Sequence, residues 1–330
     1  MKQMTLKNFA RDAPFIAVEA APRPLGANDV RIAIHAASIN PLDTKQRSGA
    51  YASIVNDQAV LGADVAGVIT EVGAAVTGFA IGDRVYGCAG GLTGRDGAYA
   101  TEMAADFRLI AHAPQSLTLR EAAALPLVAI TAWEALVDRA PVKPGDLVLV
   151  HGAAGGVGHI GVQLARAMGS IVHATVSSEA KAAIARDLGA DVAIDYRAQT
   201  VADYVAQATG GRGYDVVFDT IGGNNIQPSI EAVGDNGNVV TIVSGGASAD
   251  LSNLMPHNAS LHVVFMLVPM LRNRDLERHG DILARIARLV DGGRVKPVVD
   301  PARFMLDDLA TAHDHLTSGK AIGKVVIDVA

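Results

Sequence analysis

Several glycines follow a short apolar run near the middle of the chain, and their spacing suits phosphate binding. Residues 147–150 predict a strand. The segment after the glycines predicts a helix, because Ile160, Leu164 and Met168 recur at four-residue intervals. A loop without side chains lets the backbone approach a phosphate, and the first turn of a helix adds unpaired N–H groups and partial positive charge. The residues that we predict to hold a dinucleotide pyrophosphate are Gly152, Ala154, Gly155, Gly156, Val157 and Gly158.

The strict spacing G-x-G-x-x-G also occurs, at Gly156, Gly158 and Gly161, but this register starts too deep in the predicted helix. Counted from the end of the strand, Ala153 stands where the strict fingerprint has its first glycine. Close packing of helix against sheet is the better explanation for Gly161. Because glycines also serve ordinary turns, the prediction depends on the sequence of strand, loop and helix.

Composition and charge limit the classes of protein to which the chain can belong. It has 330 residues, enough for two domains, and a net charge of −6 that argues against nucleic acid or an anionic membrane as main partner. With Cys88 as the single cysteine, no internal disulfide or cysteine-rich zinc site can form. The first residues lack the apolar core of a signal peptide, and no apolar window is long enough to span a bilayer. We expect a cytoplasmic protein.

The pattern of elements changes twice along the chain. Residues 1 to about 120 are rich in short strands and turns, with candidate strands at 30–34 and 65–72. From about 121, helices alternate with strands at 147–150, 171–176, 192–194, 216–218 and 239–243, and 262–267 is a candidate sixth strand. This alternation predicts a parallel, doubly wound sheet. After about 270, an amphipathic helix and a final strand at 325–329 are expected to return to the N-terminal domain.

Five further motifs together resemble one known family. They are SINPLDTKQRSGAY at 38–51, LGADVAGVITEVGAAVTGFAIGDRVYG at 61–87, LPLVAITAWEAL at 125–136, YDVVFDTIGG at 214–223 and SGKAIGKVVI at 318–327. In this order they resemble the medium-chain dehydrogenase/reductases, and among these the zinc-free quinone oxidoreductases and zeta-crystallins. The resemblance implies an α/β protein with a GroES-like β-rich catalytic domain at 1–122 and 268–330. A Rossmann domain with a doubly wound parallel sheet would occupy 123–267.

The same resemblance predicts that the chain holds no metal. The positions that carry the catalytic zinc ligands in zinc alcohol dehydrogenases correspond here to Asn40, Ala63–Asp64 and Leu127, and the structural four-cysteine lobe is absent. Without zinc, the reaction between alcohol and ketone loses the Lewis acid that polarises the C–O bond. Hydride transfer to an electron-poor acceptor, such as a quinone or the β-carbon of an enone, stays feasible.

Three residues are candidates for the catalytic site, and each has a structural alternative. The resemblance implies that Asn40 lines the cleft for nicotinamide and substrate, although it can also cap its Ile-Asn-Pro turn. Tyr51 resembles a tyrosine that faces substrate and could donate a hydrogen bond to an oxyanion, or it packs over a loop. Thr131 corresponds to a threonine near the nicotinamide, or it starts a helix.

The end of the second strand of the predicted Rossmann domain decides between the two nicotinamide cofactors. An NAD enzyme has a carboxylate there to bind the ribose 2′-hydroxyl, whereas this chain has Ser177. Ser177, Lys181 and, by resemblance, Tyr196 are predicted to hold a 2′-phosphate, which favours NADPH. Their alternatives are capping of the next helix by Ser178, a solvated surface charge at Lys181, and packing of Tyr196. Glu179 argues the other way, although it belongs to the first helical turn.

These inferences predict an NADPH-dependent reductase of quinones or α,β-unsaturated carbonyls that needs no metal. Thr220 follows a strand on the side of the sheet where ligands bind, and completes the predicted cofactor site. The alternatives are a zinc alcohol dehydrogenase and a non-catalytic NADPH-binding protein with a structural or regulatory role. Family resemblance further implies a homodimer in which the apolar edge strand predicted at 262–267 pairs with its copy.

Overall fold

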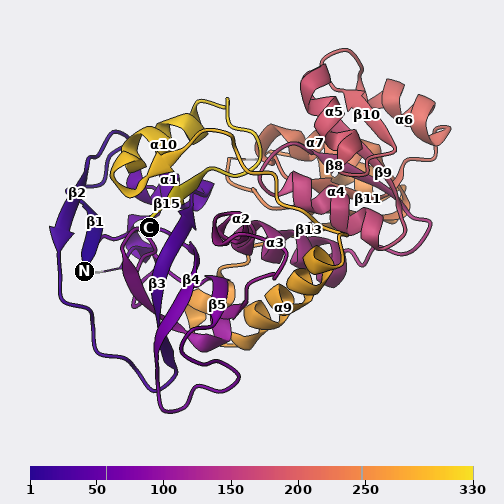
Figure 1. The fold of residues 1–330 in the computed structure, drawn as a ribbon. Helices are drawn as coiled ribbons and strands as arrows, with labels where there is room; N and C mark the ends of the chain where they lie inside the picture. Colours follow the sequence, from indigo (N-terminus) through magenta and orange to yellow (C-terminus); the bar gives the residue numbers. More distant parts are fainter. Residues whose placement is uncertain (57, 247, 330) are drawn as a thin grey trace. The chain divides into compact units, whose positions relative to one another are not determined.

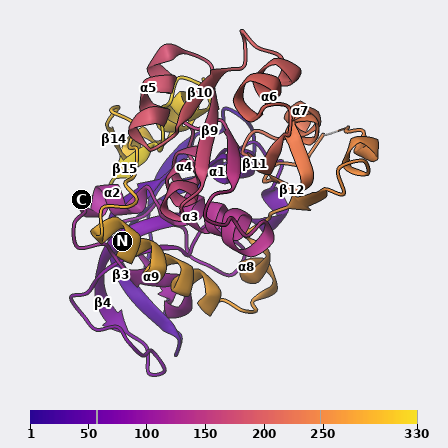
Figure 2. The ribbon, with the colours of Figure 1, turned by 90° about the vertical axis from the view of Figure 1, so that its right-hand side faces the viewer.

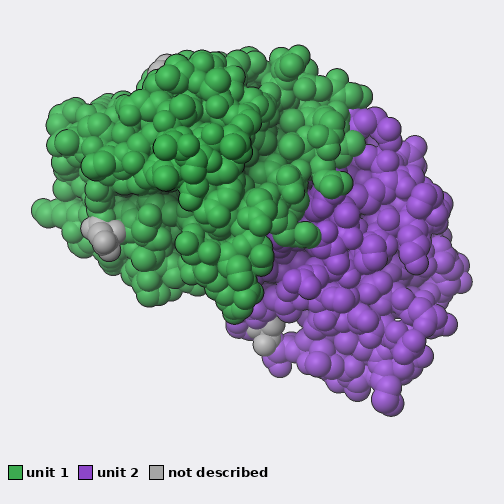
Figure 3. Space-filling view, turned by 90° about the horizontal axis from the view of Figure 1, so that it is seen from below, with its two compact units in different colours: residues 1–130, 267–293, 297–330 green, residues 131–266, 294–296 purple. Residues whose placement is uncertain are grey.

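The computed structural model describes residues 1–56, 58–246 and 248–329, and the chain forms an α/β fold of two compact units (Figure 1). Unit 1 comprises Met1–Ile130, Leu267–Gly293 and Pro297–Ala330, and unit 2 comprises Thr131–Met266 and Arg294–Lys296 (Figure 3). The predicted class, a β-rich domain combined with a doubly wound domain, is confirmed. The exact domain boundaries at 122 and 267 stay a prediction.

A six-stranded parallel sheet forms the centre of unit 2. Its strands are β8 (Leu147–His151), β9 (Ile171–Val176), β10 (Val192–Asp195), β11 (Tyr214–Asp219), β12 (Val233–Thr241) and β13 (Ser260–Val263). They lie in the order β10-β9-β8-β11-β12-β13, and every neighbouring pair is parallel. In this order the direction of winding reverses between β8 and β11. Doubly wound sheets bind ligands at such a point, beyond the carboxyl ends of the strands.

Helices cover both faces of this sheet (Figure 2). They are α4 (Gly158–Ala167), α5 (Glu179–Asp187), α6 (Val201–Thr209) and α7 (Ile226–Ala232). On one face α4 packs so closely that a Cβ on Gly161 would lie 2.8 Å from the Phe218 ring, which confirms the packing role predicted for this glycine. On the other face Leu149 and Val217 form a buried core with side chains of α6 and α7.

Two predicted strands of unit 2 differ from the observed ones. The strand expected at 239–243 is β12, which begins much earlier, at Val233. The sequence did not show this start, because polar residues in the first half of β12 interrupt the apolar pattern. The candidate sixth strand at 262–267 is β13 at Ser260–Val263. It ends there because the chain leaves the sheet after Val264, whose amide still bonds to Thr241, and turns into the proline-started helix α8 (Val268–Arg272).

A mostly antiparallel sheet forms the core of unit 1. Its strands are β3 (Asp29–Ser38), β4 (Asp64–Val72), β5 (Arg84–Cys88), β6 (Glu102–Asp106), β7 (Ile110–His112), β14 (Phe304–Met305) and β15 (Val326–Asp328). The order is β14-β15-β3-β4-β5-β7, and β6 also pairs with β3. Because β15 pairs with β3, the expected return of the chain end to the N-terminal domain is confirmed. A separate two-stranded sheet joins β1 (Lys2–Leu6) to β2 (Phe15–Glu19).

The helices of unit 1 are short, apart from one. They are α1 (Pro41–Arg47), α2 (Leu119–Ala123), α8, α9 (Glu277–Asp291) and α10 (Leu309–Thr317), and α3 (Pro126–Trp133) runs from unit 1 into unit 2. The amphipathic helix expected after 270 is α9, which buries Ile282, Leu283 and Ile286. Among the described residues, no helix is both long and apolar enough to cross a membrane.

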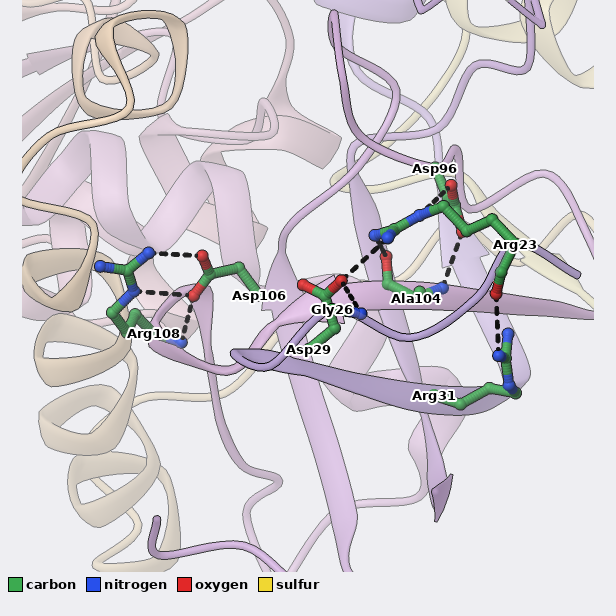
Figure 4. A network of polar contacts seen from close by, with 8 residues as sticks. All are labelled: Arg23, Gly26, Asp29, Arg31, Asp96, Ala104, Asp106 and Arg108. Atoms are coloured by element: carbon green, nitrogen blue, oxygen red, sulfur yellow. Dashed lines mark hydrogen bonds and ion pairs between the residues drawn. The ribbon is translucent and has the colours of Figure 1, made fainter. Parts of the chain in front are cut away.

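An arginine joins distant segments of unit 1 (Figure 4). Arg23 donates from Nη1 to Asp29 Oδ2 at 2.8 Å and from Nε to Asp96 Oδ1 at 2.9 Å. It also donates to the Ala104 carbonyl, and its own carbonyl accepts from Arg31. Asp96 Oδ2 in turn accepts from the Ala104 amide at 2.9 Å. One side chain therefore ties the segment before β3 to a loop and to β6.

We expect Arg23→Ala to lower the free energy of unfolding by about 2 kcal/mol, because two largely buried carboxylates lose their charged donor. Urea denaturation followed by circular dichroism measures this. Arg274, whose ion pair with Asp275 is 69% exposed on both sides, provides the control. Arg274→Ala should change the value by less than about 0.5 kcal/mol. Equal effects of the two substitutions would show that the Arg23 network adds no stability.

Candidate functional site

The glycine loop after β8 presents bare backbone at the winding reversal of the parallel sheet. Gly152 has a φ of +70°, and a Cβ there would lie 2.9 Å from Thr220 Oγ1. At Gly158, the first residue of α4, a Cβ would come within 2.2 Å of the Gly152 carbonyl oxygen. Side chains are therefore excluded at both ends of the loop, which leads directly into the N-terminus of α4, the partially positive end of that helix. This geometry fits a pyrophosphate.

Gly155 is the exposed glycine of the loop. Its amide donates to the Gly152 carbonyl at 2.9 Å, and an added Cβ would contact the same oxygen at 3.1 Å. A small shift of the loop would accommodate that Cβ. Gly155 can therefore carry a side chain that would project at the predicted phosphates without preventing folding, which makes it the position of choice for testing the loop.

The loop after β11 is fastened to the glycine loop. Thr220 Oγ1 donates to the His151 carbonyl at 2.6 Å. Asp219 Oδ1 accepts from the amides of Ile221 and Gly222 at 3.0 and 2.9 Å. Since His151 and Asp219 are paired across β8 and β11, Thr220 lies beside the glycine loop. The structure thus brings Thr220 to the predicted site, while its contact with a cofactor stays a prediction.

His151, at the end of β8, was not identified from the sequence. Its Nδ1 lies 3.0 Å from Thr175 Oγ1, and burial lowers its pKa to about 4, so the ring is neutral at pH 7. With Thr175 and Asp219 it forms a buried polar row across three strands, directly below the two loops. The sequence signal was available, because a histidine ended an otherwise apolar strand.

The residues predicted to select the cofactor lie near the carboxyl ends of β9 and β10. Ser177 follows β9 directly and is half-buried. The Tyr196 amide donates to the Val176 carbonyl at 3.3 Å, which brings the backbone of Tyr196, 53% exposed, close to Ser177. Lys181 lies in the first turn of α5. Where NAD enzymes have a carboxylate that binds the ribose 2′-hydroxyl, this chain has the hydroxyl of Ser177. This difference fits a 2′-phosphate better than a free 2′-hydroxyl.

The alternatives for this corner of the site are partly resolved. Ser178 caps α5, since its Oγ accepts from the Lys181 amide at 3.4 Å. The Glu179 carboxylate accepts from Arg186 at 2.6 Å along the same helix. Its charge is therefore compensated within α5, which weakens the objection that Glu179 raised against a bound phosphate.

A buried polar cluster in unit 1 joins the positions that correspond to zinc ligands in the resemblance. Asp64, the first residue of β4, accepts from Asn40 Nδ2 at 2.9 Å and from the Leu127 amide at 2.8 Å. Ser38 Oγ donates to the same carboxylate at 2.8 Å. Lys324, just before β15, places its Nζ 3.5 Å from Asp64 Oδ2 and donates to Asn40 Oδ1. The cluster therefore contains an amide, a carboxylate and a lysine where metal ligands would converge.

Burial sets the acid–base properties of this cluster. Burial lowers the pKa of the Lys324 ammonium below its usual value, and the carboxylates of Asp64 and Asp43 offset this only in part. Burial raises the pKa of Asp43 to about 7, against hydrogen bonds from the amides of Asn40 and Gly62 at 2.8 and 3.2 Å. The pKa of the Cys88 thiol is raised well above its usual range by burial and by Asp64. At neutral pH, Cys88 is therefore a protonated, unreactive thiol.

The three predicted catalytic residues have different surroundings. Asn40 is completely buried, and its side chain bonds to Asp64 and Lys324 rather than capping its own turn. Tyr51 is half-buried outside this cluster, and the Nζ of Lys45 lies 5.5 Å from its ring centroid. Thr131 is a buried residue of α3. Their roles in a reaction stay predictions.

Lys324 and Asp64 were the residues of this cluster that the sequence analysis missed as functional candidates. Lys324 is a charged residue between two short apolar runs, 321–323 and 325–327, and a charge in such a segment requires a buried partner. Among the described residues, no three His, Cys, Asp or Glu side chains form a group that could hold a metal ion.

Two family models match the chain. The alcohol dehydrogenase GroES-like domain matches residues 26–115, and the zinc-binding dehydrogenase model matches residues 188–327. An alcohol dehydrogenase superfamily protein from Novosphingobium aromaticivorans is 37% identical, with full coverage of both chains and a TM-score of 0.94. The quinone oxidoreductase of Escherichia coli, solved with NADPH, is 27% identical over 99% of this chain and all of that one, with a TM-score of 0.85. Other matching structures are described as an NAD-dependent alcohol dehydrogenase and as quinone oxidoreductases.

The curated relatives are much longer proteins. The pikromycin polyketide synthase component PikAII of Streptomyces venezuelae is 36% identical over 96% of this chain, which spans only 8% of that protein. Others are described as polyketide synthases or as a phthioceranic/hydroxyphthioceranic acid synthase, and this chain spans 13% to 15% of their length. The two family models and the full-length structural matches agree with one another. The chain is an oxidoreductase of the medium-chain dehydrogenase/reductase family, in the branch of the quinone oxidoreductases.

Proposed function

We propose that the protein reduces quinones or α,β-unsaturated carbonyls at the expense of NADPH and without a metal ion. The observation that carries this proposal is the buried cluster of Asn40, Asp64 and Lys324. An ammonium group held among these oxygens repels a second cation, and the positions of the family's zinc ligands offer neither thiolate nor imidazole. A reaction that needs no Lewis acid is therefore favoured.

The cofactor site follows from the residues at the sheet edge. The backbone of Gly152 to Gly158 and the start of α4 would bind the pyrophosphate, with Thr220 beside them. Ser177, Lys181 and Tyr196 would hold the 2′-phosphate. When bound, the reduced nicotinamide supplies a hydride. The presence of NADPH in the E. coli quinone oxidoreductase structure supports this choice over NADH.

The acceptor must already be electron-poor, because the proposed site offers no metal to polarise a simple ketone. Its oxygen gains negative charge during the reduction and needs a hydrogen-bond donor and then a proton. Tyr51, a half-buried phenol, and solvent are the proposed proton sources. Asn40 and Thr131 complete the proposed site. Quinones and conjugated carbonyls share the required chemistry, and the similarity to quinone oxidoreductases supports this class.

A panel of acceptors tests the proposal directly. Purified protein is mixed with NADPH and, in turn, 1,4-benzoquinone, menadione, cyclohex-2-enone and a saturated ketone, and NADPH absorbance is followed. We expect turnover with at least one quinone or enone and none with the saturated ketone. Tight NADPH binding without any turnover would favour the non-catalytic alternative. Stoichiometric zinc together with alcohol oxidation would favour a zinc alcohol dehydrogenase.

We further propose a homodimer that joins the β13 edges of two copies into one continuous sheet. β13 is an edge strand, and its last residue, Val263, and Phe265 just beyond it are 54% and 46% exposed. We expect light scattering at micromolar concentration to give the mass of a dimer for the unmodified protein. Val263→Lys should be a monomer, because its charge would lie between the two joined edge strands. Val192→Lys on the opposite edge strand, β10, is the control and should stay dimeric. A monomeric unmodified protein would refute this assembly.

A further inference from the structure

Three oxygen atoms surround the ammonium of Lys324 in the interior of unit 1. Nζ donates to the Ile39 carbonyl at 3.1 Å and to Asn40 Oδ1, and lies 3.5 Å from Asp64 Oδ2. The side chain is only 3% exposed. An ammonium has three N–H donors, whereas a neutral amine has two and a lone pair that would face one of the oxygens. The arrangement of three acceptors therefore fits the charged form.

The orientation of the Asn40 amide supports the same conclusion. Its Nδ2 donates to Asp64 Oδ2, and its Oδ1 accepts from Lys324 Nζ. Asp64 is fully buried, and besides Nδ2 it accepts from Ser38 Oγ and the Leu127 amide. These groups are all neutral donors, and Lys324 supplies the opposite charge that a buried carboxylate requires. Amide, carboxylate and backbone oxygen are also ligand types that bind cations in proteins.

We propose that this cluster is a cation site whose cation is supplied by the chain itself, the tethered ammonium of Lys324. The site is formed by the Ile39 carbonyl, Asn40 Oδ1 and Asp64 Oδ2. Shortening the lysine leaves a cavity of the shape of n-propylammonium, lined by these oxygens. A role of Lys324 in catalysis rests on the proposed function. In that reaction, Lys324 is a positioning residue that acts through Asn40.

Chemical rescue tests the cation site. Lys324→Ala should lower the melting temperature. n-Propylammonium, which replaces the deleted atoms, should raise that temperature by about 3 °C or more at a concentration well above its Kd. n-Propanol fills the same space without the charge and should not raise the melting temperature. The unmodified protein and Lys320→Met, a change at an exposed lysine in the same segment, should respond to neither compound. Equal effects of n-propylammonium and n-propanol on Lys324→Ala would overturn the cation site.

A second variant pair keeps the test valid if Lys324→Ala does not fold. Lys324→Met leaves the Asp64 carboxylate without a cation, whereas Lys324→Met combined with Asp64→Asn removes both charges. The double variant should be the more stable of the two, because a neutral pair requires no buried cation. A double variant that is no more stable than Lys324→Met would overturn the proposal.

The catalytic part is measured separately. In a protein that reduces a quinone, Lys324→Ala should lower kcat by about 10- to 100-fold, the range found when a group that orients a ligating or reacting residue is lost. The Kd for NADPH should stay unchanged, and n-propylammonium should restore kcat. An unchanged kcat in the folded variant would overturn the positioning role. If the unmodified protein reduces no acceptor, the proposed function fails, whereas thermal rescue still decides the cation site.

Discussion

Replacing Ser177 with aspartate is expected to lower the preference for NADPH over NADH by about 30- to 150-fold. The new carboxylate would face the 2′-phosphate of NADPH but could accept hydrogen bonds from the 2′-hydroxyl of NADH. Two unit charges about 4 Å apart repel by roughly 1 kcal/mol in water and about 4 kcal/mol at an intermediate dielectric. Since Ser177 is half-buried, we expect an intermediate loss of about 2–3 kcal/mol. The measurement is kcat/KM for both cofactors with one quinone.

Two further variants show whether the effect is local to the predicted pocket. Lys181→Ala should weaken NADPH binding and leave NADH binding nearly unchanged, because only the phosphate has a charge for the ammonium to attract. Ala180→Asp places a carboxylate on the exposed surface of the same helical turn and should change the ratio only slightly. The 2′-phosphate pocket is wrongly assigned if the unmodified protein prefers NADH, or if Ser177→Asp leaves the ratio unchanged.

Gly155→Asp is expected to weaken NADPH binding by about 100-fold or more, which corresponds to about 3 kcal/mol. A carboxylate at this position would face the pyrophosphate where the structure offers bare backbone. Gly155 is exposed and lacks a positive φ, and its added Cβ would meet only the Gly152 carbonyl, at 3.1 Å. The variant should therefore fold, and the loss should be one of affinity. Quenching of intrinsic fluorescence on titration with NADPH measures the Kd.

Gly155→Asn is the matched control, because asparagine has the size of aspartate without its charge. We expect Gly155→Asn to bind NADPH about 10-fold or more tightly than Gly155→Asp, since the difference between them is the electrostatic repulsion. Melting temperatures of the two variants within a few degrees of the unmodified protein would confirm that both are folded. A Kd for Gly155→Asp equal to that of the unmodified protein would remove the loop from the site.

Local features of the sequence were sufficient to predict the glycine loop of unit 2 and the strand and helix on either side of it. The strand predicted at 147–150 and the glycines after it are adjacent in sequence. Their geometry therefore follows from the backbone angles that glycine allows, the steric exclusion of side chains and the start of the next helix. The parallel, doubly wound character of the observed sheet follows from the alternation of strands and helices, whereas its strand order was not predicted. Where the pattern was obscured, as by Asp235 and Asn236 at the start of β12, the boundary was missed.

The unit 1 cluster could not be predicted in the same way. Lys324 meets Asn40 and Asp64 only because β15 pairs with β3 and β3 with β4. Lys324 is 284 positions from Asn40 and 260 from Asp64 in sequence. No periodicity records such a pairing. The resemblance predicted that Asn40 borders the substrate cleft, and this stays a prediction; the sequence did not indicate that the amide is completely buried and bonded to Asp64 and Lys324. An isolated lysine in an apolar C-terminal segment was the available signal.

In the proposed reaction, this chain transfers a hydride from NADPH to an electron-poor acceptor without a metal. The most direct measurement is the initial rate of NADPH oxidation with 1,4-benzoquinone, before and after treatment with a chelator, with zinc content determined on the same samples. We predict the same rate in both samples and far less than one zinc ion per chain. Stoichiometric zinc, with a rate that disappears on chelation and returns when zinc is added, would contradict the claim.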